Sequence, residues 1–165
     1  AMEDKLHCAC NTLKTNINDL EARIGNLLEE KKKLEAQVFE LKKKLVSNKA
    51  ADNPDNFEAV NGVKFVAKIL ENIPAKELKA FVDEIKAQYP EDTIVALLAS
   101  NEGKASVVIG VSDNLAAKYP ANSLIKVIAP FVGAQGGGGR PDMAQTGGPD
   151  ATRMQEAIDA LRKAI

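Results

Sequence analysis

A heptad pattern of apolar residues in the first 45 positions constrains the fold more strongly than any other feature of the sequence. Apolar residues recur at alternating intervals of four and three, every d position is Leu, and most a positions are apolar with Lys31 as the charged exception. β-Branched residues at a with Leu at d favour two-stranded pairing. The pattern predicts a helical coiled-coil rod over residues 1–49. Its packing or dimerisation contacts would be Leu13, Ile17, Leu20, Ile24, Leu27, Leu34, Val38 and Leu41.

A second pattern competes with a continuous rod. Asn16 is followed three residues later by Asp19, which resembles a helix N-cap pair. Residues 15–18 are also poor helix formers. The rod therefore either continues or turns near residue 16, with two helices packed antiparallel. Both alternatives need a partner surface because a lone helix of this length is marginally stable. We expect a homodimer or a folded-back hairpin.

The rest of the chain predicts a compact domain. A polar linker over residues 50–56 precedes an α+β domain over residues 57–165. Asn61-Gly62 between apolar runs is a strong hairpin signal, and residues 93–99 and 105–111 read as strands. Helices are expected after Pro74, at a Ser112 cap, around Ile125, and after a cap at Asp150 or Thr152. We predict a sheet of four or five strands with packed helices.

Composition and charge exclude several classes of protein. Hydrophobic residues make up 45% and charged residues 27%, and no apolar run approaches the roughly 18 residues that span a bilayer. The first 49 residues hold ten basic and eight acidic side chains, against twelve and fifteen in the remainder. Any nucleic-acid surface must therefore be a local patch. The chain starts with Ala and shows no signal peptide, so we expect a cytoplasmic fragment of a longer protein.

Cys8 and Cys10 lie beside the single histidine, His7. A structural zinc site needs about four ligands at suitable spacing, and Cys-x-Cys on a helix directs the two thiols differently. We expect no metal site and no cofactor in this chain.

The stretch "GAQGGGGRPDMAQTGG" (residues 133–148) carries the clearest functional signal. It is neither a P-loop, because Gly139 is followed by Arg140 and Pro141, nor a dinucleotide fingerprint. Successive glycines let backbone N–H groups approach a ligand. Arg140 adds a forked donor suited to phosphate or a base edge, and Pro141-Asp142 predicts a turn. A tight crossing within the domain, with Arg140 paired to Asp142 or Asp150, is an equally open interpretation.

Residues 136–148 resemble the signature GGGRPDMAQAGG at the C-terminus of bacterial alanyl-tRNA synthetases, and the rod, linker and α+β order extend the resemblance over the whole chain. The globular part is shared with DHH-type phosphoesterases. Thr146 replaces a common Ala, and Ala134-Gln135 replaces a common Gly-Lys, which removes one positive charge. The resemblance implies an accessory domain that binds the elbow of alanine-specific tRNA and helps couple aminoacylation with editing. ATP, Mg and Zn would be bound only by upstream domains of the same enzyme, so the fragment would not be an enzyme.

The residues that would contact RNA follow from the same resemblance. They are Gly136, Gly137, Gly138, Gly139, Arg140, Asp142, Gln145, Gly147 and Gly148. Two other functions stay open: a structural dimerisation or tethering module, and the substrate-binding half of a phosphoesterase whose Asp-His-His metal cluster would lie elsewhere.

Overall fold

The computed structural model describes residues 1–48 and 57–165, and the linker expected at 50–56 lies outside the described residues. The chain divides into two compact units, residues 1–47 and 48–165. We call them the helical unit and the globular unit, and each is described by itself.

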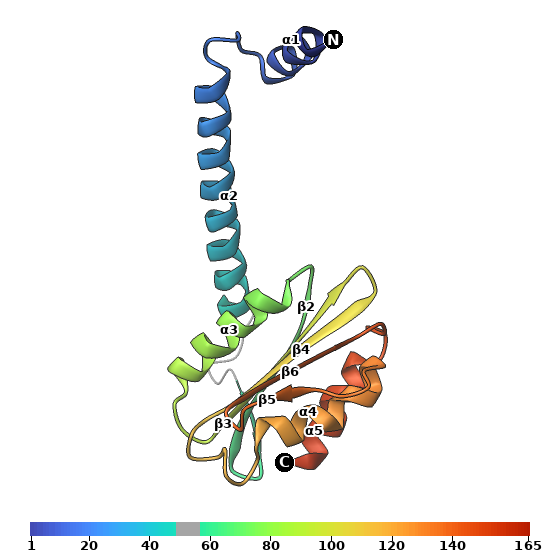
Figure 1. Ribbon diagram of the computed structural model, residues 1–165. Helices are drawn as coiled ribbons and strands as arrows, with labels where there is room; N and C mark the ends of the chain where they lie inside the picture. Colours follow the sequence, from blue (N-terminus) through green and yellow to red (C-terminus); the bar gives the residue numbers. More distant parts are fainter. Residues whose placement is uncertain (49–56) are drawn as a thin grey trace. The chain divides into compact units, whose positions relative to one another are not determined.

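The helical unit contains α1 (Met2–Leu13) and α2 (Leu20–Asn48) (Figure 1). Lys14 ends α1 with a left-handed backbone, φ 51°. The Asn16 side chain then accepts a hydrogen bond from the Asp19 amide (3.0 Å) and donates one to the Asp19 carboxylate (2.7 Å). This reciprocal pair satisfies a backbone donor at the start of the next helix. The chain thus turns where the cap pattern is found.

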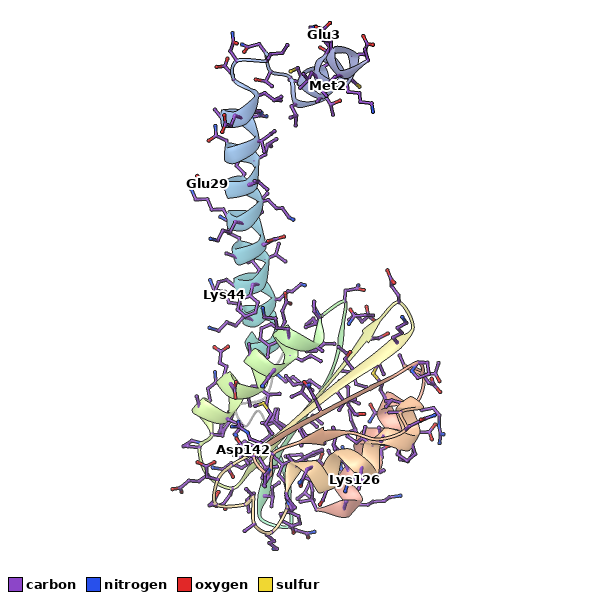
Figure 2. All side chains as sticks on the ribbon, in the orientation of Figure 1. Met2, Glu3, Glu29, Lys44, Lys126 and Asp142 are labelled. Atoms are coloured by element: carbon purple, nitrogen blue, oxygen red, sulfur yellow. The ribbon has the colours of Figure 1, made fainter. Side chains whose placement is uncertain are left out.

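The apolar stripe of α2 is not covered within its own unit. Among its heptad residues, Leu34 and Leu41 are about three-fifths exposed, at 59% and 60%, and Ile24 is 44% exposed. Ile17 lies in the turn between the helices rather than on a helix and is 52% exposed. Charged side chains such as Glu29 and Lys44 also project from α2 (Figure 2). The antiparallel packing of the two helices is therefore not seen, and the coiled coil stays a prediction.

The globular unit is built on a mixed sheet of six strands in the order β1-β2-β3-β4-β6-β5 (Figure 1). The strands are β1 (Glu58–Val60), β2 (Val63–Glu71), β3 (Thr93–Asn101), β4 (Lys104–Val111), β5 (Gly138–Gly139) and β6 (Met143–Gly148). Only the β2–β3 pair is parallel. Asn61 (φ 50°) and Gly62 (φ 82°) form the expected hairpin turn between β1 and β2. The prediction of an α+β domain is confirmed, with more strands than expected.

Helices cover both faces of this sheet. They are α3 (Ala75–Gln88), α4 (Ala121–Ile128), the short 3-10 helix η1 (Ala129–Val132) and α5 (Met154–Ala164). One face carries α3, and the other carries α4 and α5 (Figure 1). The central strand β3 is buried from both sides: Leu97 and Ile94 each have 0% exposure. Gly110 on β4 allows close packing, because a Cβ atom there would overlap the Val82 side chain of α3.

Two of the expected helix caps have different roles. The segment after Ser112 forms turns rather than a short helix, and the Ser112 hydroxyl instead accepts a hydrogen bond from the Thr93 amide (3.0 Å). Asp150 accepts hydrogen bonds from the amide (2.8 Å) and the hydroxyl (2.6 Å) of Thr152. It thereby braces the turn before α5 rather than the first turn of that helix.

Candidate nucleic-acid interface

The glycine-rich segment is a β-hairpin of the sheet rather than a loop. Gly138 pairs with Gln145 and Gly139 with Ala144, joining β5 to β6. β6 in turn pairs with the apolar strand β4, for example through Ala144 and Ile109. Gly has low strand propensity, but pairing with a buried neighbour overrides it. The sequence alone therefore did not reveal two of the six strands.

Two glycines of the hairpin are required by close backbone approach. A Cβ atom on Gly139 (φ 153°) would overlap the Met143 carbonyl oxygen, and one on Gly148 would overlap the Val132 carbonyl. By contrast, a Cβ atom on Gly138 would meet nothing within 4 Å. The tight-crossing interpretation therefore accounts for Gly139 and Gly148, while Gly138 borders open space.

Thr146 forms a hydrogen bond with the residues that precede β5. Its hydroxyl donates a hydrogen bond to the Gly136 carbonyl oxygen (2.7 Å). A Cβ atom on Gly137 would lie 3.0 Å from both the Ile125 side chain of α4 and Thr146. Thr146 thus holds residues 136 and 137 against the sheet.

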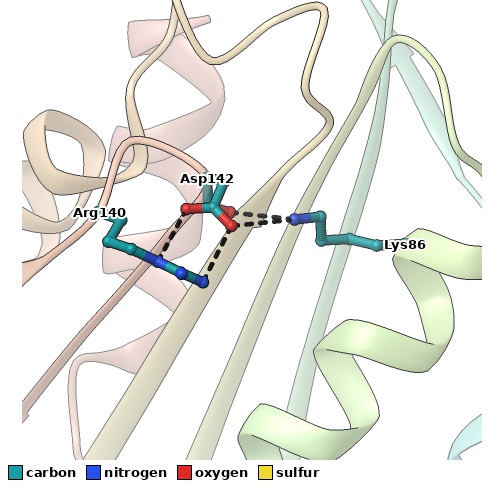
Figure 3. Close-up of polar contacts among 3 residues, drawn as sticks. All are labelled: Lys86, Arg140 and Asp142. Carbon is teal, nitrogen blue, oxygen red and sulfur yellow. Dashed lines mark hydrogen bonds and ion pairs between the residues drawn. The ribbon is translucent and has the colours of Figure 1, made fainter.

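Arg140 and Asp142 lie in the turn between β5 and β6 and pair with each other. Arg140 Nε and Nη2 each lie 3.2 Å from a different oxygen of the Asp142 carboxylate. Lys86 of α3 reaches the same residue: its Nζ lies 3.9 Å from Asp142 Oδ2 and donates to the Asp142 main-chain carbonyl oxygen (3.3 Å) (Figure 3). The partner of Arg140 is Asp142 and not Asp150, whose carboxylate is bound by Thr152.

The hydrogen bonds from Thr152 also affect the pKa of Asp150. They favour the ionised carboxylate and hold the pKa of Asp150 below its ordinary value. The charge of Arg153 acts in the same direction, so a negative charge lies two residues after the end of β6.

A shallow depression of about 270 Å³ borders the hairpin. It is lined by Lys79 of α3 and by Gly138, Gly139, Arg140, Met143, Ala144 and Gln145. A second depression, of about 280 Å³, contains Gly136 and Gly137 together with Lys126 of α4, labelled in Figure 2. Four of the expected RNA-contacting residues thus gather at the first depression and two at the second.

The remaining expected contacts lie elsewhere. Gly147 and Gly148 pair with Ser106 and Ala105 of β4 and line neither depression. Asp142 holds its two cations in the turn beside the first depression. The sequence analysis missed Lys79 and Lys86. Their spacing of seven residues places them on one side of α3, beside its apolar stripe, which is the signal that could have identified them.

Among the described residues, no aromatic side chain lines either depression beside the hairpin. Phe65 and Phe81 are buried core residues, each 2% exposed. Arg153 covers the ring of Phe131, with 5.0 Å from the guanidinium carbon to the ring centre. Phe57 packs edge-on against Tyr89. The hairpin surface therefore presents backbone and cations rather than aromatic faces.

The described residues also limit other chemistries. Residues 1–48 and 57–165 contain no group of three or more His, Cys, Asp or Glu side chains suited to hold a metal ion. In the same residues, no helix combines the length and apolar character needed to cross a lipid bilayer. Both cysteines are free thiols, with Cys8 exposed and Cys10 buried.

The family model and the similar proteins point to the same family. The model of the DHHA1 domain matches residues 62–165. Alanine–tRNA ligase of Paramagnetospirillum magneticum is 41% identical over 165 residues, which is 100% of this chain and 18% of the ligase. Alanine–tRNA ligase of Granulibacter bethesdensis is 43% identical over 163 residues, covering 99% of this chain and 18% of the ligase. The chain thus spans less than a fifth of the length of these relatives.

A solved structure agrees with these matches. The C-Ala domain of Aquifex aeolicus alanyl-tRNA synthetase superimposes with a TM-score of 0.61 at 28% identity, covering 64% of this chain and 94% of that domain. The chain belongs to the DHHA1 domain family and is similar over its full length to the corresponding part of alanine–tRNA ligases.

Proposed function

We propose that this chain is the C-terminal accessory part of an alanine–tRNA ligase, which binds the elbow of alanine-specific tRNA and helps couple aminoacylation with editing. The observation that carries the proposal is similarity to such ligases along the entire chain, together with the fold of a C-Ala domain. The accessory part itself would neither activate alanine nor hydrolyse mischarged tRNA.

The geometry of the hairpin supports contact with a folded RNA. Proteins recognise such RNA largely by shape, backbone and sugar contacts. The hairpin exposes glycine backbone between two depressions, one containing Arg140 and Lys79 and the other containing Lys126. Each depression thus carries local positive charge on a chain whose net charge is −1. Asp142 offsets only part of that charge, because it faces both Arg140 and Lys86.

The catalytic steps are assigned to the rest of the longer ligase. Relatives are more than five times the length of the segment that matches this chain. ATP, Mg and Zn would be bound by those upstream domains, which are also partners of this chain, and the whole enzyme would act in the cytoplasm. The accessory part would keep one tRNA bound while its acceptor end is presented to two catalytic sites.

A binding experiment tests this proposal. The purified chain is titrated with alanine-specific tRNA and with a minihelix that contains the acceptor and T stems but no D-loop. We expect measurable binding of the tRNA, weaker binding of the minihelix, and an affinity that falls as salt rises. Equal affinity for both RNAs would contradict elbow recognition, and no binding by the folded chain would contradict RNA binding.

A second candidate is a dimerisation or tethering module without RNA binding. The exposed stripe on α2 favours it, since Leu34 and Leu41 are each about three-fifths exposed in the single chain. A homodimer through this stripe is compatible with tRNA binding by the globular unit. Measuring the mass of the chain at the concentrations of the RNA titration separates the two activities.

A further inference from the structure

The depression between α3 and the glycine hairpin has the composition of an anion site. Its floor consists of Met143 and Ala144, which are 7% and 1% exposed. Its rim carries the polar groups of Lys79, Arg140 and Gln145. An apolar ligand would find little surface here, because the buried side chains of the floor are only two. A cation would meet positive charge at the rim.

Lys79 is the cation at the depression whose ammonium group is available to bind a ligand. In residues 1–48 and 57–165 its ammonium group has no ion pair or hydrogen bond, and its side chain is exposed. Lys86, seven residues later on the same helix, is by contrast 17% exposed and bound to Asp142. The two lysines of α3 therefore differ in role: Lys86 holds the turn, and Lys79 borders the depression.

Asp142 orients the guanidinium of Arg140 but does not occupy all of its N–H donors. Its Nε and Nη2 contact Asp142, which Lys86 anchors from α3 (Figure 3). No bond is found for Nη1 among the described residues, and the side chain is 75% exposed. A guanidinium held in this way retains donors for an incoming anion, since it has five N–H groups in a fixed fork.

The glycine hairpin leaves open space through which an anion can reach Lys79 and Arg140. Nothing lies within 4 Å of a Cβ position on Gly138, and β5 is the edge strand of the sheet. A tetrahedral anion can therefore approach the backbone closely, as in other glycine-lined anion sites. The volume of about 270 Å³ is many times the roughly 15 Å³ that one water molecule requires, so the depression has room for a phosphate group.

We propose that this depression binds a phosphate group, with Lys79 of α3 as the second cation beside Arg140. The inference rests on the proposed function, in which the phosphate belongs to the RNA backbone. It extends the interface from the glycine segment to a helix that precedes the segment by about fifty residues in the sequence. A free phosphate or nucleotide offers the same chemistry and is separated from RNA by experiment.

The test uses Lys79→Ala with Lys76→Ala as its matched control. Lys76 lies one turn earlier on α3, is exposed and does not line the depression. We expect Lys79→Ala to weaken tRNA binding about fivefold to tenfold and to reduce the slope of log affinity against log salt by about one, with an unchanged melting midpoint. Lys79→Arg should restore most of the affinity. Equal behaviour of Lys79→Ala and Lys76→Ala would overturn the inference while leaving RNA binding intact.

A second arm uses inorganic phosphate and does not require RNA binding. At constant ionic strength, phosphate in place of chloride should raise the melting midpoint of the wild-type chain more than that of Lys79→Ala. If the chain binds no tRNA but shows this difference, the proposed function fails and the phosphate site stands as a site for free phosphate. If phosphate protects both proteins equally and the tRNA affinities also match, the site is refuted.

Discussion

The helical and globular units use their apolar residues in opposite ways. In the globular unit, β3 and the helix faces around it are closed, and Leu97 and Ile94 have no exposed surface. In the helical unit, α2 leaves Leu34 59% and Val38 47% exposed, although they follow a regular heptad spacing. The same kinds of side chain thus complete a core in one unit and present an uncovered stripe in the other.

This difference indicates which contacts each unit needs. A closed core lets the globular unit fold by itself, because burial of apolar surface is the main stabilising term. A single helix of the length of α2 gains most of its stability from packing of its apolar face. The helical unit is therefore expected to depend on a surface outside itself, and the globular unit is not.

The largest expected effect comes from charging the stripe. Leu27→Asp combined with Leu34→Asp places two carboxylates at d positions. Burial of an unpaired charge costs roughly 3 kcal/mol or more. If two copies pair through α2, the double variant should fall to the monomer mass in sedimentation equilibrium. Asn26→Asp with Ala36→Asp adds the same charge off the stripe and should leave the mass unchanged.

If the Leu27, Leu34 variant does not fall to the monomer mass, the helical unit does not pair with a second copy through its stripe. An identical mass for wild type and the Leu27, Leu34 variant at every concentration would show that a second copy does not cover the stripe. The partner surface would then belong to another part of the longer protein. The stripe of α2 would then make a contact within one copy of the longer protein and not a contact between two copies.

The sequence predicted the two units unequally. The helix break was readable because Asn16 and Asp19 satisfy each other locally. The β1–β2 hairpin was readable because Asn61 and Gly62 both adopt positive φ. The sequence does not identify the surface that covers the α2 stripe. Heptad spacing indicates that a partner exists, but it does not say whether α1, a second copy or another domain supplies it.

A smaller effect is expected within the hairpin of the globular unit. Gly139→Ala should lower the free energy of unfolding by about 1–3 kcal/mol, because the backbone conformation is unfavourable for other residues and the Met143 carbonyl occupies the space. Gly138→Ala, at open space, should change it by less than about 0.5 kcal/mol. Tyrosine fluorescence during urea unfolding reports this unit alone, since both tyrosines lie in it and the chain has no Trp.

These two substitutions also test whether the glycine segment is structural. Similar losses at both positions would mean that the hairpin is more tightly enclosed than the space around Gly138 indicates. Similar tolerance would mean that β5 pairs only weakly with β6. The expected contrast would leave Gly138 free for a role at the surface.

The candidate site was only partly readable from the sequence. The Pro141-Asp142 turn and the pairing of Arg140 with Asp142 follow from local chemistry. The contribution of α3 does not, since Lys86 reaches Asp142 across 56 positions of the sequence and only the folded sheet brings them together. The same holds for β6, which is a strand because β4 lies beside it.

The smallest expected effect separates surface function from stability within the globular unit. The Arg140–Asp142 pair is largely solvent-exposed on the Arg140 side (75%), and an exposed ion pair contributes at most about 1 kcal/mol to stability. Arg140→Ala should therefore move the melting midpoint little. If Arg140 contacts an RNA phosphate, tRNA affinity should fall about fivefold to tenfold, on the order of 1 kcal/mol, and less so at high salt.

Arg162→Ala is the control for this prediction. Arg162 of α5 pairs with Glu58 of β1 at 2.9 Å and with Asp159 at 2.6 Å, and it lines neither depression at the hairpin. Because Arg162 makes two ion pairs, its loss should lower the midpoint at least as much as the loss of Arg140, and it should leave tRNA affinity unchanged. The reverse result for Arg140→Ala, a clear drop in midpoint with unchanged tRNA affinity, would make Arg140 a brace of the turn. The contact surface for tRNA would then have to lie away from the hairpin, and the glycines would be explained by packing alone.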